Sequence, residues 1–336
     1  MTTISSWRPR SLYTCTFIWI SAVGGRFLVV LLEHQGQLSP TELGAILALA
    51  QVVTVAASFV TGSYADILEN RYPHHGRAIV VAVGILIGSL VFCGHALTTI
   101  PGLSPVLWHG FLRLLMAVAT AMVFPVLDGI CLDYLAESTN TQEYGKERLY
   151  GAVSWGVANM IAAVGLEYVG FSILYVMTLV STILTLITIW AYTKSQESRR
   201  SYEKQDSNII GEINEEEDDD TVMAINVQKP PRSNRFKKSH SELSSSISST
   251  IHILQSLCVY GFGACFAISQ ITQSSGQAIV DNLIFLYFEQ LQSSYILMGW
   301  TVVLTVAFEI PLFQIAPTLL KAWGPGILIP IAAFSY

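Results

Sequence analysis

The sequence predicts an all-α, polytopic membrane protein, and its composition and charge distribution are the reasons. Of the 336 residues, 52% are hydrophobic and only 12% are charged, against about 25% charged residues in an ordinary soluble domain. Of the 42 charged residues, 20 lie between Lys194 and Thr250. The 22 that remain are too few to cover the surface of a soluble protein, so we expect most of the chain to lie in a bilayer.

Apolar runs long enough to cross a bilayer follow one another along the chain. A membrane helix needs about 20 mostly apolar residues. The predicted spans are residues 12–32, 43–65, 78–98, 106–133, 149–169, 171–192, 252–288 and 296–320. Another apolar run starts near Gly324 and reaches only to Tyr336, so we expect the chain to stop inside a ninth span.

Basic residues occur in every second connection between these spans. They follow the second, fourth, sixth and eighth spans, whereas residues 33–42, 99–105 and 289–295 contain no Lys or Arg. Because basic residues favour the cytoplasmic side, the pattern predicts a cytoplasmic N-terminus and a cytoplasmic central linker. Which cellular membrane holds the protein does not follow from the pattern.

The span pattern and the charged stretch together divide the chain into three parts. Residues 1–193 are expected to form an N-terminal six-helix bundle, and residues 251–336 part of a second bundle. Residues 194–250 contain the acidic run GEINEEEDDD and few large apolar residues, so we expect a disordered linker. This linker is either a solvated tether or a site for cytoplasmic regulators, through phosphorylation or anionic lipid.

Two arginines fall inside predicted spans, where a charge costs roughly 2.5–3.5 kcal/mol on insertion scales. Arg26 lies in the first span after Gly24 and Gly25, which would permit a bend or a close helix approach. It is either a cation that faces a wet cavity or a snorkelling arginine. Arg113 is closer to the outer end of the fourth span and is interpreted as snorkelling.

Two acidic residues inside spans are candidates for proton or cation chemistry. Asp128 follows Pro125, where the helix should kink, and it could accept a proton or form a structural pair. Glu309 stands two residues before Pro311 in an apolar stretch. A carboxyl that can exchange a proton is what a proton-coupled carrier requires, so Glu309 is the first candidate for coupling. The alternative is that Glu309 pairs with an arginine.

The seventh predicted span contains a polar stripe. Gln270, Gln273, Gln277 and Asp281 are separated by three or four residues, which places them on one face of a helix. Such a face suits a water-filled path for a polar solute, and it equally suits hydrogen bonding between buried helices.

Sequence signatures of enzymes were sought and not found. The chain contains no GxGxxG, no P-loop, no HExxH and no GxSxG. The five cysteines lie in apolar runs without metal-ligand spacing. We therefore expect no catalytic activity, no cofactor, no metal site and no nucleic-acid partner.

Several short motifs resemble those of the major facilitator superfamily. The segment GSYAD at 62–66, followed by Arg71 and Arg77, resembles the signature loop of that superfamily. Ile67 and Glu69 depart from it, because a basic residue and a second glycine are usual there. The segment YGKERLYG at 144–151 and the EIPLF at 309–313 look like the subgroup related to lactose permease and nucleoside:proton symporters, including the MFS domain-containing 6-like proteins.

This resemblance implies two six-helix halves, alternating access and a cytoplasmic gate in which Asp66 and Arg71 take part. With the buried charges, it leads to the hypothesis of a proton-coupled symporter for a small polar solute, with Arg26, Asp128, the polar stripe and Glu309 lining the path. The alternative is a membrane receptor or scaffold that retains the fold without transporting.

Overall fold

The computed structural model describes two stretches of the chain. They are residues 8–216 and 280–331, without 24, 74, 99, 138–143, 282, 325, 329 and 330. No side chain is described at 199, 200 or 202–216. The predicted stripe residues Gln270, Gln273 and Gln277 therefore lie outside the described residues, as does most of the predicted span 252–288.

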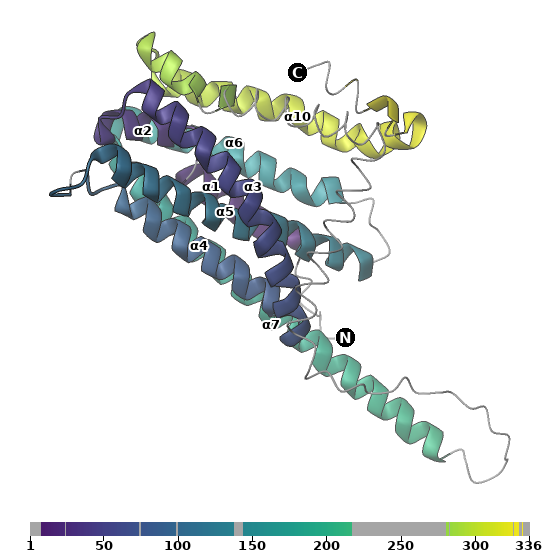
Figure 1. Ribbon diagram of the computed structural model, residues 1–336. Coiled ribbons are helices and arrows are strands. Elements are labelled where there is room, and N and C mark those ends of the chain that lie inside the picture. The colour runs from purple at the N-terminus through teal and green to yellow at the C-terminus, as the bar shows by residue number, and fades with distance from the viewer. Residues whose placement is uncertain are drawn as a thin grey trace, which may run out of the picture.

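Within these stretches the protein is helical, as the sequence predicted (Figure 1). The helices are α1 (Pro9–Val23), α2 (Phe27–Gly36), α3 (Pro40–Arg71), α4 (Gly76–Gly94), α5 (Pro105–Glu137), α6 (Tyr144–Val169), α7 (Ser172–Glu216) and α10 (Tyr295–Trp323). Residues 283–290 are also helical. The described part contains no strand, only an isolated bridge between Ile100 and Leu103.

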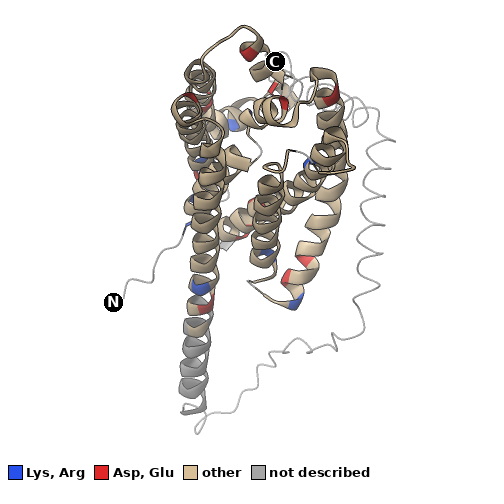
Figure 2. Cartoon of the chain, turned by 90° about the vertical axis from the view of Figure 1, so that its left-hand side faces the viewer, with Lys and Arg blue, Asp and Glu red and all other residues tan. Residues whose placement is uncertain are grey.

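Seven of the described segments are long and apolar enough to cross a membrane. They correspond to the first six predicted spans and to the span at 296–320, which confirms those seven predictions. Figure 2 shows long stretches of these helices without a charged residue. The protein is thus an integral, multi-pass membrane protein.

The first span is broken into two helices, α1 and α2, next to the tandem glycines. α1 ends at Val23 and α2 begins at Phe27. A Cβ atom at Gly25 would lie 2.4 Å from the carbonyl oxygen of Ser21, so this local backbone requires glycine. Of the two roles that the sequence left open for these glycines, a bend or a close helix approach, the structure has the bend, and it places Arg26 between two helices.

Helix α1 lies at the centre of the N-terminal bundle, and Trp19 fixes its position. The indole is fully buried and donates from Nε1 to Ser89 Oγ on α4, at 2.9 Å. The same hydroxyl lies 2.6 Å from Thr182 Oγ1 on α7. A Cβ at Gly88 would lie 2.6 Å from the Trp19 ring. One hydrogen-bonded chain therefore connects three helices inside the bundle.

Pro125 interrupts the hydrogen-bond pattern of α5, and a neighbouring helix compensates for it. A proline cannot donate to the carbonyl four residues earlier, here that of Ala121. Thr61 Oγ1 on α3 donates to this carbonyl oxygen at 2.8 Å. The carbonyl oxygen of Ala121 thus keeps a hydrogen-bond donor inside the bilayer, where no water is available to donate in its place.

Helices α6 and α10 pack antiparallel, and small residues allow their close approach. A Cβ at Gly299 would lie 2.6 Å from Ala163 Cβ, and one at Gly156 would lie 3.2 Å from Val306. At the start of α10, the Tyr295 backbone N–H donates to Glu167 Oε2 at 2.9 Å. This pair of helices, visible along one side of the bundle in Figure 1, joins the segment after residue 280 to the N-terminal helices.

Polar contacts gather at one end of the bundle. Arg10 approaches Glu147 at one end, and His75 Nε2 lies 3.1 Å from Glu197 Oε1 at the same end. These residues belong to the connections that basic residues assigned to the cytoplasm. Their gathering at one end fits the predicted alternation, while the orientation in the membrane stays a prediction.

Helix α7 differs from our expectation for the start of the linker. We expected residues 194–250 to lack regular structure, but α7 continues to Glu216 and projects beyond the bundle (Figure 1). From Lys194 to Ile210 the sequence has no Pro or Gly. Because the membrane span is already helical, no new nucleation is needed, and good helix formers can extend the helix. Residues 217–250 lie outside the described residues.

The packing of α6 against α10 gives a first testable prediction. Gly299→Ala should lower the stability of the folded protein by about 1–3 kcal/mol, because the added methyl group has no space beside Ala163. Thermal unfolding of the purified protein in nanodiscs measures this effect. Gly44→Ala is the matched control, because a Cβ there meets nothing within 4 Å. Equal melting temperatures for the two variants would contradict the proposed close packing.

Candidate functional site

The break between α1 and α2 places Arg26 against the segment after residue 280. Arg26 Nη2 donates to Asp281 Oδ1 at 2.6 Å, across 255 residues of sequence. The Arg26 side chain is 13% exposed and that of Asp281 is 38% exposed. The guanidinium also lies over the Trp155 ring, 5.3 Å from its centroid, and 5.8 Å from that of Phe285. Arg26 is therefore an ion-paired and ring-stacked cation, not a free snorkelling side chain.

Glu309 lies close to this pair. It is half-buried on α10 and interacts electrostatically with Arg26, Asp281 and the more peripheral Arg148. Val306, one helical turn before Glu309, packs against Gly156, the neighbour of Trp155. Arg26, Asp281 and Glu309 thus form one group, which we call the Arg26 cluster. It combines one cation with two carboxyl groups at the contact between the N-terminal helices and α10.

Asp128 lies elsewhere. Its Oδ1 accepts a hydrogen bond of 2.6 Å from the hydroxyl of Tyr13, and it interacts with Tyr144 and Arg148. Tyr13 and Arg26 are thirteen residues apart, which is about 20 Å along a helix. The structure therefore does not bring Asp128 into the Arg26 cluster, and the contact with Tyr13 fits the structural pairing that the sequence left open.

The two predicted gate residues, Asp66 and Arg71, have different partners in the structure. Asp66 Oδ1 accepts from Arg77 Nη2 at 2.8 Å, and Arg77 also bonds Asp133 on α5. Arg71 instead lies over the Tyr72 ring, 5.6 Å from its centroid. The partner of Asp66 is therefore Arg77, which bridges α3 and α5 from the first turn of α4. A gating role for Asp66 and Arg71 stays a prediction.

A buried histidine pair lies at the other end of the bundle. His95 Nδ1 is 2.9 Å from His109 Nδ1, the rings are stacked, and both side chains are fully buried. Since one Nδ1 must donate and the other accept, the pair shares one proton at this contact. Burial, with the nearby His109 and Arg113, lowers the pKa of His95, just after the α4 span, to about 3.

Arg113, one helical turn after His109, is buried and lines a cavity of about 260 Å³ between α1, α3 and α5. Its side chain is 9% exposed, so the predicted snorkelling to the surface does not occur. The polar residues of this cavity, of which Gln51, Thr54 and Ser58 come from α3, were not among the residues predicted from the sequence. Their spacing of three and four residues within an apolar span was the signal that could have identified them.

These features define a class of protein. An all-helical bundle with seven candidate membrane spans in its described part, partly buried ion pairs and a partly open polar cavity is typical of membrane proteins that handle solutes. The model of the MFS_1 like family matches residues 10–336. The chain belongs to this family, and it is thus a protein of the major facilitator type. Comparison with the curated proteins and with the solved structures gives no match.

Membership of this family indicates a transporter for a small solute. The family is not an enzyme family, which is consistent with the sequence-based expectation. Within the described residues, no group of three or more His, Cys, Asp or Glu side chains is arranged to hold a metal ion. The subgroup named by the short motifs stays a prediction.

The ion pair of the Arg26 cluster gives a second prediction. Asp281→Asn and Arg26→Gln should each lower thermal stability, because each leaves a partly buried charge without its partner. The loss of unfolding free energy in the double variant should be smaller than the sum of the two single losses, by about 1 kcal/mol or more. Arg71→Gln with Asp281→Asn is the control pair and should be additive, since Arg71 lies at the end of α3 over the Tyr72 ring and has no contact with Asp281. Additive losses for both pairs would exclude a direct interaction.

The histidine pair gives a third prediction. In the unfolded chain His95 binds a proton near its ordinary pKa of 6.5, whereas in the folded protein it does so only near 3. Acid therefore favours unfolding, so the stability due to neutral His95 is complete above pH 6.5 and decreases as the pH falls towards 3. His95→Asn should reduce the drop in melting temperature between pH 7.5 and pH 5. An unchanged drop in His95→Asn would refute this assignment.

Proposed function

We propose that the protein is a secondary active transporter that moves a small polar solute by alternating access and couples this movement to a proton. The observation that carries the proposal is the Arg26 cluster. It lies where α10 meets the N-terminal helices, so a relative movement of the two parts changes its contacts. Proteins that alternate between two open states keep their coupling groups at such a boundary.

Charge counting supports a proton in this cluster. With both carboxyl groups ionised, Asp281 and Glu309 place two negative charges beside Arg26, and the more peripheral cation near Glu309 is Arg148, which also interacts with Asp128. One bound proton makes the three groups neutral together, which a low-dielectric environment favours. Asp281 holds the direct 2.6 Å contact with Arg26, so Glu309 is the carboxyl group that we assign to the proton.

The coupling step then follows from competition for Arg26. When Glu309 releases its proton, its carboxylate competes with Asp281 for the guanidinium, and the ion pair between Arg26 and Asp281 weakens. When Glu309 is protonated, that ion pair is restored and draws the segment after residue 280 towards α1 and α2. Proton binding and the relative position of the two parts are thereby linked.

Asp66, Arg77 and Asp133 supply a second set of contacts at the end that we assign to the cytoplasm. Arg77 connects the first turn of α4 to α3 and α5 through these two carboxylates. Both acids are more than 60% exposed, so the contacts are weak enough to break and reform during a cycle. This cluster is the gate that we propose for the protein, with Arg77 in place of Arg71.

Uptake into proteoliposomes tests the proposal. Uptake of a transported solute should accelerate when the outside is made acidic, and a protonophore should remove the acceleration. Glu309→Gln should abolish the effect of the pH gradient while solute exchange without a gradient persists, because the amide cannot exchange a proton. Glu42→Gln is the control, because this residue lies in the first turn of α3 and glutamine retains the capping contact with Ser39.

The possible outcomes test proton coupling, the role of Glu309 and transport itself separately. Uptake that ignores the gradient in the unmodified protein would remove the proton, and full coupling in Glu309→Gln would remove this residue. If no solute in a broad panel is taken up while a cytoplasmic protein binds the segment after α7, the receptor or scaffold alternative is favoured.

A further inference from the structure

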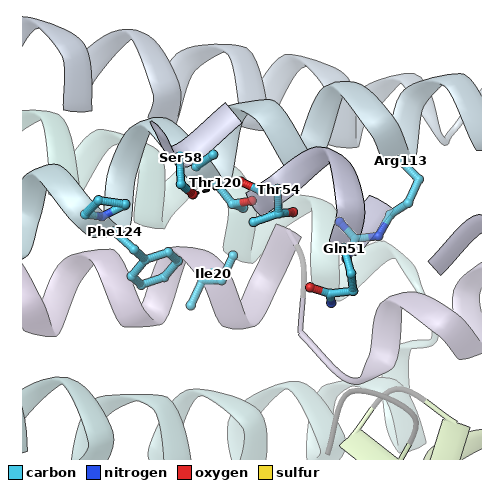
Figure 3. Close-up of a pocket in the computed structure, with 9 residues that line it drawn as sticks. Ile20, Gln51, Thr54, Ser58, Arg113, Thr120 and Phe124 are labelled. Atoms are coloured by element: carbon cyan, nitrogen blue, oxygen red, sulfur yellow. Dashed lines mark hydrogen bonds between the residues drawn. The ribbon is translucent and has the colours of Figure 1, made fainter. Parts of the chain in front are cut away.

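The cavity between α1, α3 and α5 is separate from the Arg26 cluster and has a different composition. Arg113 and Gln51 lie at one end, Phe124 lies at the other, and the hydroxyls of Thr54, Ser58 and Thr120 lie between them (Figure 3). Arg113 is eight residues after the start of α5, and Phe124 nineteen, so the cavity spans depths of about 12–28 Å from that end. It therefore reaches towards the middle of the bilayer.

Arg113 is the unusual member of this cavity, because it is a buried cation without a countercharge. The side chain is 91% buried, and its Nε has no hydrogen-bond partner. The described residues that line the cavity include no carboxylate, and Arg113 forms no ion pair within the described part of the chain. A buried charge is expected to be paired, so an anionic ligand is the partner that this arrangement lacks.

The histidines beside Arg113 cannot supply that countercharge. His95 and His109 share one proton at their Nδ1 contact and are either neutral or positively charged. The Nε2 atoms of both rings are buried without partners. They border the cation without compensating it, so the net charge at this end of the cavity stays positive.

The hydroxyl groups along the cavity can accept hydrogen bonds from a ligand but cannot donate to it. Thr54 Oγ1 donates to Ala50 O at 2.9 Å, and Ser58 Oγ donates to Thr54 O at 2.8 Å. Thr120 Oγ1 donates to Met116 O and Ala117 O. Since each hydroxyl hydrogen is engaged by its own helix, the free lone pairs can only accept. They suit a ligand that carries hydrogen-bond donors next to its anionic group.

We propose that this cavity binds a small hydroxylated carboxylate. The carboxylate accepts hydrogen bonds from the Arg113 guanidinium and the Gln51 amide. The ligand hydroxyls donate to Thr54, Ser58 and Thr120. Binding at this site does not depend on transport, whereas its role as the substrate site rests on the function proposed above.

Binding of gluconate to the full chain in nanodiscs tests the proposal. Gluconate and sorbitol share a polyol chain and differ in the acid group, while acetate has the acid without the hydroxyls. Gluconate should raise the melting temperature in a saturable way, and sorbitol and acetate should bind at least about tenfold more weakly, because each lacks one set of contacts.

Three variants assign the effect to Arg113. Arg113→Gln should abolish the shift caused by gluconate and should raise the melting temperature of the free protein, because an uncompensated buried charge is removed. Arg113→Lys should bind at least about tenfold more weakly than the unmodified protein, because the ammonium cannot make two parallel hydrogen bonds. Arg8→Gln, the same change at an exposed arginine, should behave like the unmodified protein.

Equal shifts with gluconate and sorbitol, or full gluconate binding by Arg113→Gln, would overturn the proposal. Equal shifts with gluconate and acetate would overturn the role of the hydroxyl groups. Arg113-dependent binding without any flux in proteoliposomes would retain this site and refute the transporter, whereas flux that is insensitive to Arg113→Gln would retain the transporter and refute this site as the substrate site.

Discussion

The organisation of this protein depends on the cost of placing a charge in hydrocarbon. Few ionisable side chains enter the spans, and the described ones meet this cost in different ways. Arg26 is paired with Asp281 and stacked on rings. Asp128 is bound by the hydroxyl of Tyr13. Arg113 is buried without any such partner in the described part of the chain. The way in which each charge is compensated therefore distinguishes the residues that have a partner in the protein from Arg113, for which we propose a ligand.

Backbone and hydroxyl groups obey the same constraint on a smaller scale. Pro125 removes one hydrogen bond from α5, and a threonine on α3 restores it. The indole of Trp19 is satisfied by a serine that also contacts a threonine on a third helix. In an apolar solvent such bonds have no competition from water. These hydrogen bonds position α1 against its neighbouring helices. The interruption between α1 and α2 at Gly25 is thereby directed towards α10.

The sequence was sufficient for the features that depend on local composition. The apolar runs predicted the seven candidate spans of the described residues, and the tandem glycines allowed the bend before Arg26 as one of two roles. Partners were harder to predict. Asp66 has Arg71 five residues away and Arg77 eleven residues away, and only the turn between α3 and α4 decides that Arg77 is the partner. Tyr13 and Asp128 are 115 residues apart, so no local pattern connects them.

The cavity residues were missed for a related reason. Serine and threonine occur often in membrane helices, where they bond to the preceding turn, so Thr54, Ser58 and Thr120 gave no separate signal. Their importance depends on which faces of α3 and α5 meet. The extension of α7 was missed because the charged segment was interpreted by composition alone, although a helix that is already formed can continue through charged residues.

The rod-like end of α7 has a mechanical consequence. Its apolar part ends at Ser198 and the helix ends at Glu216, so its tip stands about 27 Å further on at 1.5 Å per residue. A lever of this length amplifies small rotations. A tilt of about 10° displaces the tip by roughly 5 Å while its base hardly moves. A rotation at Ser198 that hardly changes the helix packing there would therefore become a displacement of several ångströms at residue 216.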